Sequence, residues 1–358
     1  MPILRQAGFG DGTDLGIPLD HRRPLSEMHA AADFLGPGAI HTPMYQPEIL
    51  DMVRRRGVLG QRLNEEPATG QPSRYFEQTR IVVGQFQDPR NLQFTLTGDP
   101  TRRERYVRLK AIYGSIGFGL FDVEMTRQQG QFAMLVGKDI EDTVQGVLKT
   151  SDLALWNGSD TDLILETTLE YVGLLTQINR TATIASSASI VDGIKAEIAA
   201  LVAQTQFTVR PSAIYINPVL GNLIDSEERL NQRQIPQTVM NTVTGGLLVN
   251  AIATQAGLLP LIPEPFLLNG PTGGSVTESG KTDYKAVILT EELVEYHYLT
   301  TPEPRVFQLG LEGGLATRYA VVLFGGVVAK GKANATQNQG VVETNQVSYA
   351  HSILTVVR

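Results

Sequence analysis

The first 75 residues most restrict what this chain can fold into, because proline and glycine interrupt them repeatedly. Only the stretch from Pro47 to Leu59 has helical character. Such a segment buries too little apolar surface to offset the entropy that is lost when it is ordered. We therefore expect an extended arm that lies on another surface. The prolines that interrupt it are Pro18, Pro24, Pro37, Pro43, Pro47, Pro67 and Pro72.

Length and composition predict a folded chain beyond this segment. The chain has 358 residues, which is above the size at which a single hydrophobic core usually stops growing, so we expect two or more packed units. Apolar residues make up 42% and charged residues 19%, which excludes a wholly disordered, collagen-like or membrane-embedded chain. Cysteine is absent, which excludes disulfide bonds and cysteine-based metal sites.

Charge is unevenly distributed along the chain. Residues 1–125 hold 15 basic and 15 acidic side chains, and 14 of the basic ones are arginine. Residues 126–358 hold 15 basic and 22 acidic side chains, so the whole net charge of −7 arises there. This balance argues against nucleic-acid binding over the surface as a whole. The arginine-rich part fits a surface that meets other protein, and a solvated charged surface explains it equally well.

Apolar and polar residues alternate between Ile81 and Leu96, and this period of two indicates β-strand. Turn residues follow at 97–101, and the charged run Arg102–Arg105 comes directly after them. The alternation resumes from Tyr106 to Tyr113. We expect a long β-hairpin of two or three strands that ends near Phe121.

The strongest helical pattern in the chain runs over residues 122–155. At about 1.5 Å per residue, such a helix would span roughly 45 Å. Ser189 and Asp192 have the spacing of a capping box and predict a second helix. A third helix is predicted from Asn217, with Pro218 in its first turn. The apolar stripe of the first helix consists of Phe132, Val136, Ile140, Val144 and Val147.

Short apolar strands alternate with turns in the last third of the chain. No regular βαβ rhythm and no internal repeat is present. These features predict an α+β fold. The expected strands are Gly246–Asn250, Ala286–Leu289, Val306–Leu309, Tyr319–Phe324 and Ser352–Val357.

No pattern of residues predicts a catalytic, cofactor or metal site. The five histidines are scattered, and none has the spacing of metal ligands. The segment Gly273–Thr282 ends like a phosphate-binding loop, but Ser275 stands where that loop requires its first glycine. We interpret Glu291, Glu292 and Glu295 as a solvated edge of a strand or helix rather than a carboxylate pair for acid–base chemistry.

The first residues lack the basic start and apolar stretch of a signal peptide. The longest apolar run, Ala320–Ala329, is too short to span a bilayer. We therefore expect a soluble protein that is made in the cytoplasm and has no membrane partner.

The order of these features resembles that of the major capsid proteins of tailed phages, which have the Hong Kong phage capsid fold. In that order, a proline-rich arm precedes a long hairpin with a charged tip, a long amphipathic helix and a mixed α+β unit. Residues 153–160 (LALWNGSD), followed by 170–178 (EYVGLLTQI), are similar to the family's stretch after its spine helix. Residues 211–218 (PSAIYINP) are similar to the strand-to-helix entry of the family's axial domain.

The resemblance implies a particular division of the chain. Residues 1–72 would form the N-terminal arm, and residues 73–121 an extended loop built on a β-hairpin. Residues 122–206 would form a peripheral domain with the spine helix, and residues 207–318 an axial domain. Residues 319–358 would return to the peripheral domain. An arm and a hairpin of this kind become stable only by lying on neighbouring subunits.

The resemblance also implies a structural role without catalysis or a cofactor. The chain would self-assemble into hexamers and pentamers of an icosahedral phage head that encloses double-stranded DNA without sequence-specific binding. Further partners would be a portal and separate scaffolding or cement proteins. Assembly would take place in the host cytoplasm, and the protein would reside in the virion. Contacts with acidic residues of an adjacent subunit are expected from Arg102, Arg103, Arg105 and Arg108.

Two features of the family are not expected here. Some relatives join their subunits by an isopeptide bond between lysine and asparagine, but the only lysine of the extended loop is Lys110, away from the charged tip. Some carry a scaffolding segment that a protease removes, whereas this chain begins at Met1 with an arm-like sequence. We therefore expect no crosslinking, and scaffolding, where it is used, by a separate protein.

Two alternative functions stay open at this point. The first is an encapsulin-like compartment shell of the same fold that holds cargo enzymes, although the long arm and long hairpin argue against it. The second is a cytosolic enzyme, because a catalytic site assembled from dispersed residues leaves no motif.

Overall fold

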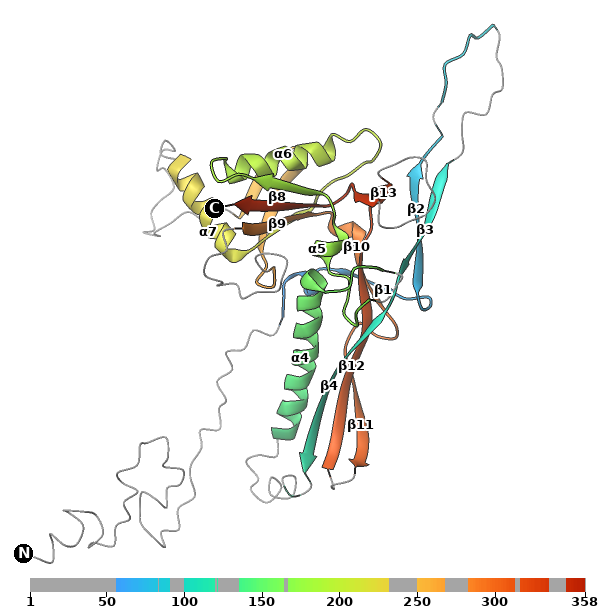
Figure 1. Ribbon diagram of the computed structural model, residues 1–358, viewed down its shortest axis with the longest axis vertical. Coiled ribbons are helices and arrows are strands. Elements are labelled where there is room, and N and C mark those ends of the chain that lie inside the picture. Colours follow the sequence, from blue (N-terminus) through green and yellow to red (C-terminus); the bar gives the residue numbers. More distant parts are fainter. Residues whose placement is uncertain are drawn as a thin grey trace, which may run out of the picture. The chain divides into compact units, whose positions relative to one another are not determined.

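The computed structural model describes residues 56–82, 84–90, 100–119, 121, 135–163, 167–231, 250–267, 283–312, 316–334 and 346–357. Contacts divide the chain into a unit from Met1 to Val53 and a unit from Arg54 to Arg358, and every described residue belongs to the second. Its elements form a mixed α+β fold (Figure 1). Several expectations lie outside the described residues: most of the arm, the strand at 92–96, the helix at 122–134 and the strand residues 246–249.

The first sheet is built around β12 (Ala316–Ala329), a long strand rich in valine. β4 (Lys110–Gly119) and β11 (Arg305–Glu312) pair antiparallel with opposite edges of β12. β10 (Val294–Tyr298) also pairs antiparallel with β12, and β1 (Asn64–Pro67) adds to β10 in parallel. The expected strands at 306–309 and 319–324 are confirmed as parts of β11 and β12.

The long helix α4 (Leu135–Asn157) packs on this sheet. Gly114 of β4 lies under the helix, where an added Cβ would come within 3.0 Å of Thr143. The close approach therefore favours glycine at this position, because any added side chain would displace Thr143 or Val147. The described part of the expected helix is confirmed, and Val144 and Val147 of its apolar stripe pack on the sheet. The core beneath it consists of Val147, Val321 and Leu323, with Ile112 and Val144 partly buried.

The second sheet has the strand order β5-β15-β9-β6-β8-β7. One face is covered by α6 (Ile190–Val202) and α7 (Pro218–Asn231). The Ser189 hydroxyl accepts a hydrogen bond from the Asp192 N–H at 3.3 Å, and the Asn217 side chain accepts one from Val219, so both predicted helix starts are confirmed. The strand bounds are β5 Thr181–Ile184, β6 Ala213–Ile216, β7 Ala251–Thr254, β8 Gly257–Pro263, β9 Asp283–Leu289 and β15 Ser352–Val357.

The two sheets group the chain differently from the division that we expected. α6 was assigned to the peripheral domain with the long helix, but Ile194 and Ile198 are fully buried against the second sheet. β15 also lies in the second sheet, between β5 and β9, whereas β10 and β11 of the expected axial domain pair in the first sheet. The domain boundaries expected at residues 207 and 319 are therefore not the positions at which the chain crosses from one sheet to the other. The reason is that side chains separated by more than 100 residues share each core.

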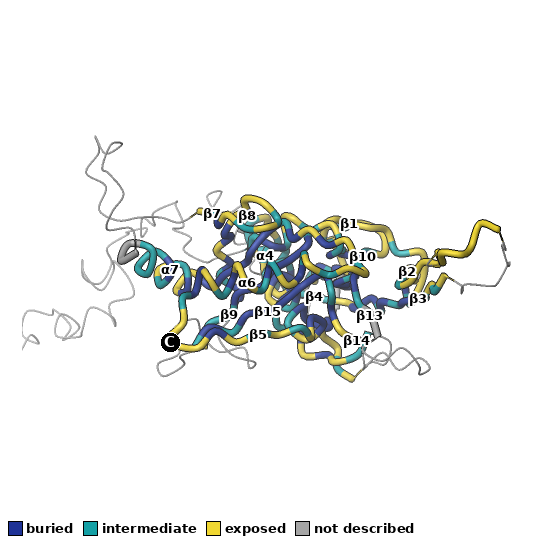
Figure 2. The backbone as a smooth tube through the Cα atoms, turned by 90° about the horizontal axis from the view of Figure 1, so that it is seen from above, coloured by how far each residue is buried: buried dark blue, intermediate teal, exposed yellow. Residues whose placement is uncertain are grey.

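A third core joins the two sheets. Trp156 at the end of α4 packs on Tyr215 of β6, with ring centroids 5.4 Å apart. The short helix α5 (Leu174–Gln177) contributes Leu174, which is fully buried. Gln177 bridges the backbone here, because its amide donates to the Val327 carbonyl at 3.0 Å and accepts from Ala329 N–H at 2.9 Å. Figure 2 shows that the buried backbone follows these packed strands and helices.

A separate hairpin is formed by β2 (Ser73–Arg80) and β3 (Thr101–Val107). A hairpin is present in the expected part of the chain, but with other bounds: β2 ends at Arg80, where the expected strand begins, and the charged run Arg102–Arg105, expected at the tip, lies within β3. The expected strand Tyr106–Tyr113 is divided between β3 and β4, so a three-stranded hairpin is not formed. β4 follows β3 after two residues and pairs with β12 instead of continuing the hairpin. Its inward side chains are needed under α4, which explains the change of partner. The remaining elements are β13 (Lys332–Asn334), which pairs with β14 (Gln346–Ser348), and the 3₁₀ turns η4 (Leu59–Gln61) and η5 (Glu291–Leu293).

None of the helices in the described part of the chain is long and apolar enough to cross a membrane.

The packing of α6 yields a first prediction. Ile194→Ala should lower the free energy of unfolding by about 3 kcal/mol, because it opens a cavity in the core of the second sheet. Lys195→Ala, at the exposed neighbouring position, should change it by less than about 0.5 kcal/mol. Urea unfolding monitored by circular dichroism measures both. Equal effects would show that α6 does not bury the face that the structure assigns to it.

Candidate assembly surfaces and the contacts that hold them

Two buried carboxylates hold the backbone at the first described residues of the chain. Asp152 of α4 accepts a hydrogen bond from the Gly57 N–H at 2.8 Å. Glu264, after β8, accepts from the N–H groups of Val58 and Leu59, both at 2.8 Å. Glu264 is fully buried and Asp152 is 4% exposed. We call the segment from Gly57 to Leu59 with these two carboxylates the arm anchor.

The arm anchor depends on very close packing. A Cβ on Gly60 would overlap the Asp152 carboxylate, and a Cβ on Gly57 would come within 2.8 Å of the Phe266 ring. Burial raises the pKa of Asp152, against the hydrogen bond from Gly57 and the nearby Arg56 guanidinium, which lower it. The anchor therefore satisfies backbone donors that would otherwise be orphaned in the interior.

The root of the β2–β3 hairpin is held by a buried ion pair. Arg105 Nε lies 3.0 Å from Glu77 Oε2, and both side chains are less than 10% exposed. The other Glu77 oxygen accepts from Gly331 N–H at 2.8 Å, and Arg105 donates to the Lys332 carbonyl at 3.0 Å. The hairpin is thus attached to the turn that follows β12, at residues 330–332.

Arg105 therefore departs from the expectation that it contacts another subunit. Its guanidinium is occupied inside its own chain, because in β3 it lies on the same side of the strand as the buried Val107. Arg102 is exposed and Arg103 half-buried, and neither makes an ion pair within the described residues. Arg108 is half-buried at the end of the hairpin, and its N–H donates to the Leu163 carbonyl at 3.2 Å.

Apolar side chains are also exposed on the hairpin. Phe76 is 73% exposed, and Ile81 and Phe86, beyond the end of β2, are exposed as well. Sequence patterning predicted Ile81 in a strand, but β2 ends at Arg80. Exposed aromatic side chains next to arginine are the composition of a protein interface.

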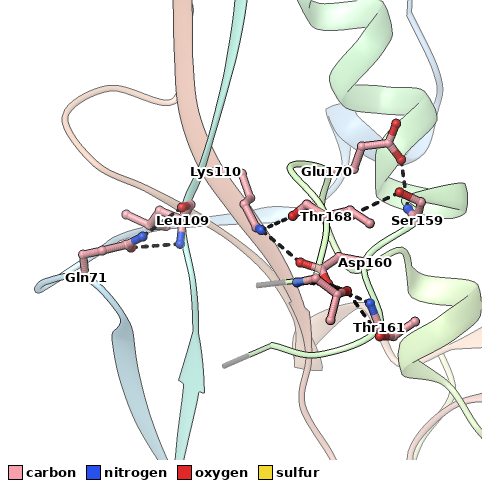
Figure 3. A network of polar contacts seen from close by, with 9 residues as sticks. Gln71, Leu109, Lys110, Ser159, Asp160, Thr161, Thr168 and Glu170 are labelled. Atoms are coloured by element: carbon pink, nitrogen blue, oxygen red, sulfur yellow. Dashed lines mark hydrogen bonds and ion pairs between the residues drawn. The ribbon is translucent and has the colours of Figure 1, made fainter. Parts of the chain in front are cut away.

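A second buried ion pair lies where β4 begins (Figure 3). Lys110 Nζ lies 2.9 Å from Asp160 Oδ2 and donates to the Thr168 carbonyl at 2.6 Å. Burial alone would raise the pKa of the Asp160 carboxyl. The hydrogen bonds that it accepts from Thr167, Lys110 and the Thr161 N–H outweigh burial and lower this pKa to about 2. Because its ammonium is 6% exposed and paired, Lys110 is not placed to form a crosslink.

An apolar groove runs beside this network. It has a volume of about 350 Å³ and is lined by α4, β4 and the loop around residue 170. Tyr113 of β4 and Leu169 of the loop are strongly exposed in it, and Leu153 of α4 is partly exposed. Exposed apolar side chains that gather in a hollow indicate a contact surface.

Of the three acidic residues interpreted as a solvated edge, Glu292 is exposed, whereas Glu291 and Glu295 are paired. Glu291 accepts from Arg62 at 2.8 Å and from the Tyr215 hydroxyl at 2.6 Å. Glu295 contacts both His297 and Lys330. Within the ranges that the structure describes, no group of three or more histidine, aspartate or glutamate side chains is arranged to hold a metal ion. The segment Gly273–Thr282 lies outside those ranges.

Sequence reasoning missed the buried carboxylates at the arm anchor and at the hairpin root. One of them left a signal, because Glu264 is the single charge in the apolar run from Leu261 to Leu267. An isolated charge in such a run is buried only where donors surround it. Asp152 and Glu77 have no comparable signal, since each has a polar neighbour, Ser151 and Gln78, and lies in no apolar run.

The arm anchor can be tested by removing one charge. Glu264→Gln should lower the free energy of unfolding by about 2 kcal/mol, because an amide cannot accept all three N–H donors around it. Amide exchange at Val58 and Leu59 should accelerate more than exchange in α6. Glu292→Gln, at an exposed position, is the control. Unchanged exchange at both amides would contradict the role of Glu264.

The Lys110–Asp160 pair predicts a pH dependence. The pKa of Asp160 is lower in the folded state than in the unfolded state. Its contribution to the free energy of unfolding is therefore fully present above pH 4 and is lost as the pH falls toward 2. Asp160→Asn should cost about 3 kcal/mol at pH 7, because it removes the buried carboxylate that lies 2.9 Å from Lys110 Nζ. The cost should be about 1 kcal/mol smaller at pH 3.

Urea unfolding at the two pH values measures this difference. Glu170→Gln is the control, because this exposed side chain keeps an oxygen that can accept from the Ser159 N–H. A cost of Asp160→Asn that does not change with pH would contradict the assignment.

Comparison with known proteins gives likeness in structure only. No protein-family model matches the chain, and no curated protein matches it. A chain of Gordonia phage Cozz superposes with a TM-score of 0.59 at 13% identity, over 94% of this chain and 98% of that one. The head structure of Helicobacter pylori bacteriophage KHP40 contains a chain with a TM-score of 0.56 at 10% identity, over 89% and 95%.

The capsid of Myoviridae phage XM1 contains a further similar chain, with a TM-score of 0.54 at 11% identity. The match covers 90% of this chain and the whole of that one. At such identities, the likeness concerns the fold. It covers about nine tenths of the chain rather than a single motif. The chain therefore has the fold of the major capsid proteins of tailed phages.

Proposed function

We propose that this chain is a major capsid protein, the structural subunit of an icosahedral phage head. It would assemble into hexamers and pentamers that enclose double-stranded DNA. The observation that carries the proposal is the likeness of fold, over about nine tenths of the chain, to proteins that form a phage head and a phage capsid. The role is structural, without catalysis.

The hairpin supports this proposal, because its exposed side chains need a partner outside their own chain. The Glu77–Arg105 pair fixes the hairpin root, and β3 leads through two residues into β4, which runs away from the hairpin (Figure 1). The hairpin therefore cannot fold back onto the groove beside β4 without breaking a buried ion pair. A second copy of the chain can supply that surface.

Contact between different surfaces of identical chains leads to a particular kind of assembly. The hairpin on one copy and a body surface on the next form a head-to-tail interface, which is repeated by every copy. Such interfaces close into rings when the rotation between copies allows it. Hexamers and pentamers are rings of this type, and a closed shell combines both.

In a phage head, this chain would have further protein partners. A portal would occupy one position of the shell, and separate scaffolding or cement proteins would assist assembly. Assembly would take place in the host cytoplasm, and the protein would then reside in the virion. The net charge of −7 supports enclosure of DNA without tight binding, since like charges do not attract.

Electron microscopy with light scattering tests the function. The chain is expressed alone and together with its neighbouring genes. Closed shells, or hexamers and pentamers, are expected. Shells from the native host that hold protein cargo and no DNA would show that the chain forms a compartment shell instead of a phage head. A monomer of 39.0 kDa under all conditions would contradict both.

The arginines at the hairpin provide a sharper test. Arg102→Ala with Arg103→Ala should lower the yield of assembled particles severalfold, because two exposed or half-exposed cations are removed from the contact surface. The circular dichroism spectrum should not change, since neither side chain makes an ion pair within the described residues. Arg210→Ala, also exposed, is the matched control. A normal yield of particles from the double variant would exclude these arginines from the interface.

A further inference from the structure

One edge of the first sheet is open. Among the described strands, β11 pairs only with β12, and β4 and β12 lie between it and α4 (Figure 1). The five residues from Arg305 to Leu309 are all exposed. Within the described ranges, their backbone groups have no hydrogen-bond partner apart from β12. The N–H and C=O groups on the outer side of this strand can therefore pair with another strand.

The composition of this edge favours such pairing. Val306 is 46% exposed, Phe307 38% and Leu309 53%. The five residues contain no proline or lysine, and Arg305 at their start is the only charge. Folded proteins usually protect an edge strand with proline, lysine or inward-pointing charges. An apolar edge without this protection indicates a contact surface rather than a solvated end of the sheet.

A β-bulge limits the length of the open edge. The register between β11 and β12 shifts between Gln308 and Leu311. A bulge bends its strand and interrupts the ladder of backbone hydrogen bonds. Uninterrupted pairing with a further strand is therefore possible over Arg305–Leu309, which we call the β11 edge.

We propose that the β11 edge pairs antiparallel with the β11 edge of a second copy, about a two-fold axis at Phe307. In this register Phe307 lies opposite Phe307 of the second copy, and Val306 lies opposite its Gln308. Aromatic side chains that are directly opposite on one face of a sheet stabilise the pairing. The inference rests on the proposed function, because five residues a side are far fewer than the roughly 20–30 of a stable interface. Many copies held in one shell supply the further contacts.

Charge selects the antiparallel arrangement. In parallel, in-register pairing, Arg305 would lie beside Arg305 of the second copy, and like charges directly opposite are destabilising. In the antiparallel register Arg305 lies opposite Leu309 of the second copy, so the two arginines are about 13 Å apart along the strand. This separation exceeds the screening length of about 8 Å at physiological salt. Identical edges that meet in this way form a closed two-fold contact and need no second kind of surface.

Disulfide formation tests the pairing, because the chain contains no cysteine. Single cysteine variants are made at each position from 305 to 309, and their particles are oxidised and analysed on a denaturing gel without reductant. Phe307→Cys should give severalfold more covalent dimer than the other four, since residue 307 alone faces itself, with Cα atoms about 5 Å apart. Lys195→Cys, at an exposed position of α6, is the control and should stay monomeric. Stronger crosslinking at another position, crosslinking to a different protein, or none would overturn the proposal.

A double variant keeps the test sharp if Phe307→Cys does not assemble. Val306→Cys with Gln308→Cys places each cysteine opposite the other kind in the second copy, so covalent dimers should form here as well. Intact particles in which neither variant crosslinks would exclude the β11 contact and leave the proposed function standing. Absence of particles from the unaltered chain would contradict the proposed function and the β11 contact together.

Discussion

The described fold depends on buried carboxylates that accept hydrogen bonds from irregular backbone. The arm anchor and the turn at residue 331 bring N–H groups into the interior without a strand or helix to pair them. Glu264 satisfies two neighbouring N–H groups with one oxygen, which no neutral side chain does as well. An anion without donors would cost several kcal/mol in such a place, so carboxylate and donors stabilise the interior only together.

The regular elements of the fold could be predicted from local residues. α6 and α7 begin where the sequence places Ser189 and Asn217, because a cap and an apolar face are both local properties. The strands at the C-terminal end follow from their valine and isoleucine content. Which sheet each element joins could not be predicted, because α6 packs against strands from distant parts of the chain. Long-range packing of this kind leaves no trace in a single sequence.

Which of the four arginines at 102–108 could contact another subunit also could not be predicted from local sequence. Four arginines in one short segment look alike in the sequence, but strand alternation gives them different surroundings. Arg105 faces the interior with Val107, where Glu77 neutralises it, whereas Arg102 on the other face stays exposed. The alternation was visible in the sequence. The missing information was which face of β3 meets the rest of the chain, and that depends on residues 331 and 332, more than 200 positions away.

The internal anchors also bear on how a subunit of this fold could associate. A loop that becomes ordered only on binding loses conformational entropy at that moment, which weakens the contact. Here the Glu77–Arg105 pair and the bonds to residues 331 and 332 order the hairpin root before any partner arrives. The entropy is then lost during folding, where the cores of both sheets offset it. Exposed side chains on a hairpin with a fixed root can therefore form weak individual contacts that add up over many copies of the chain.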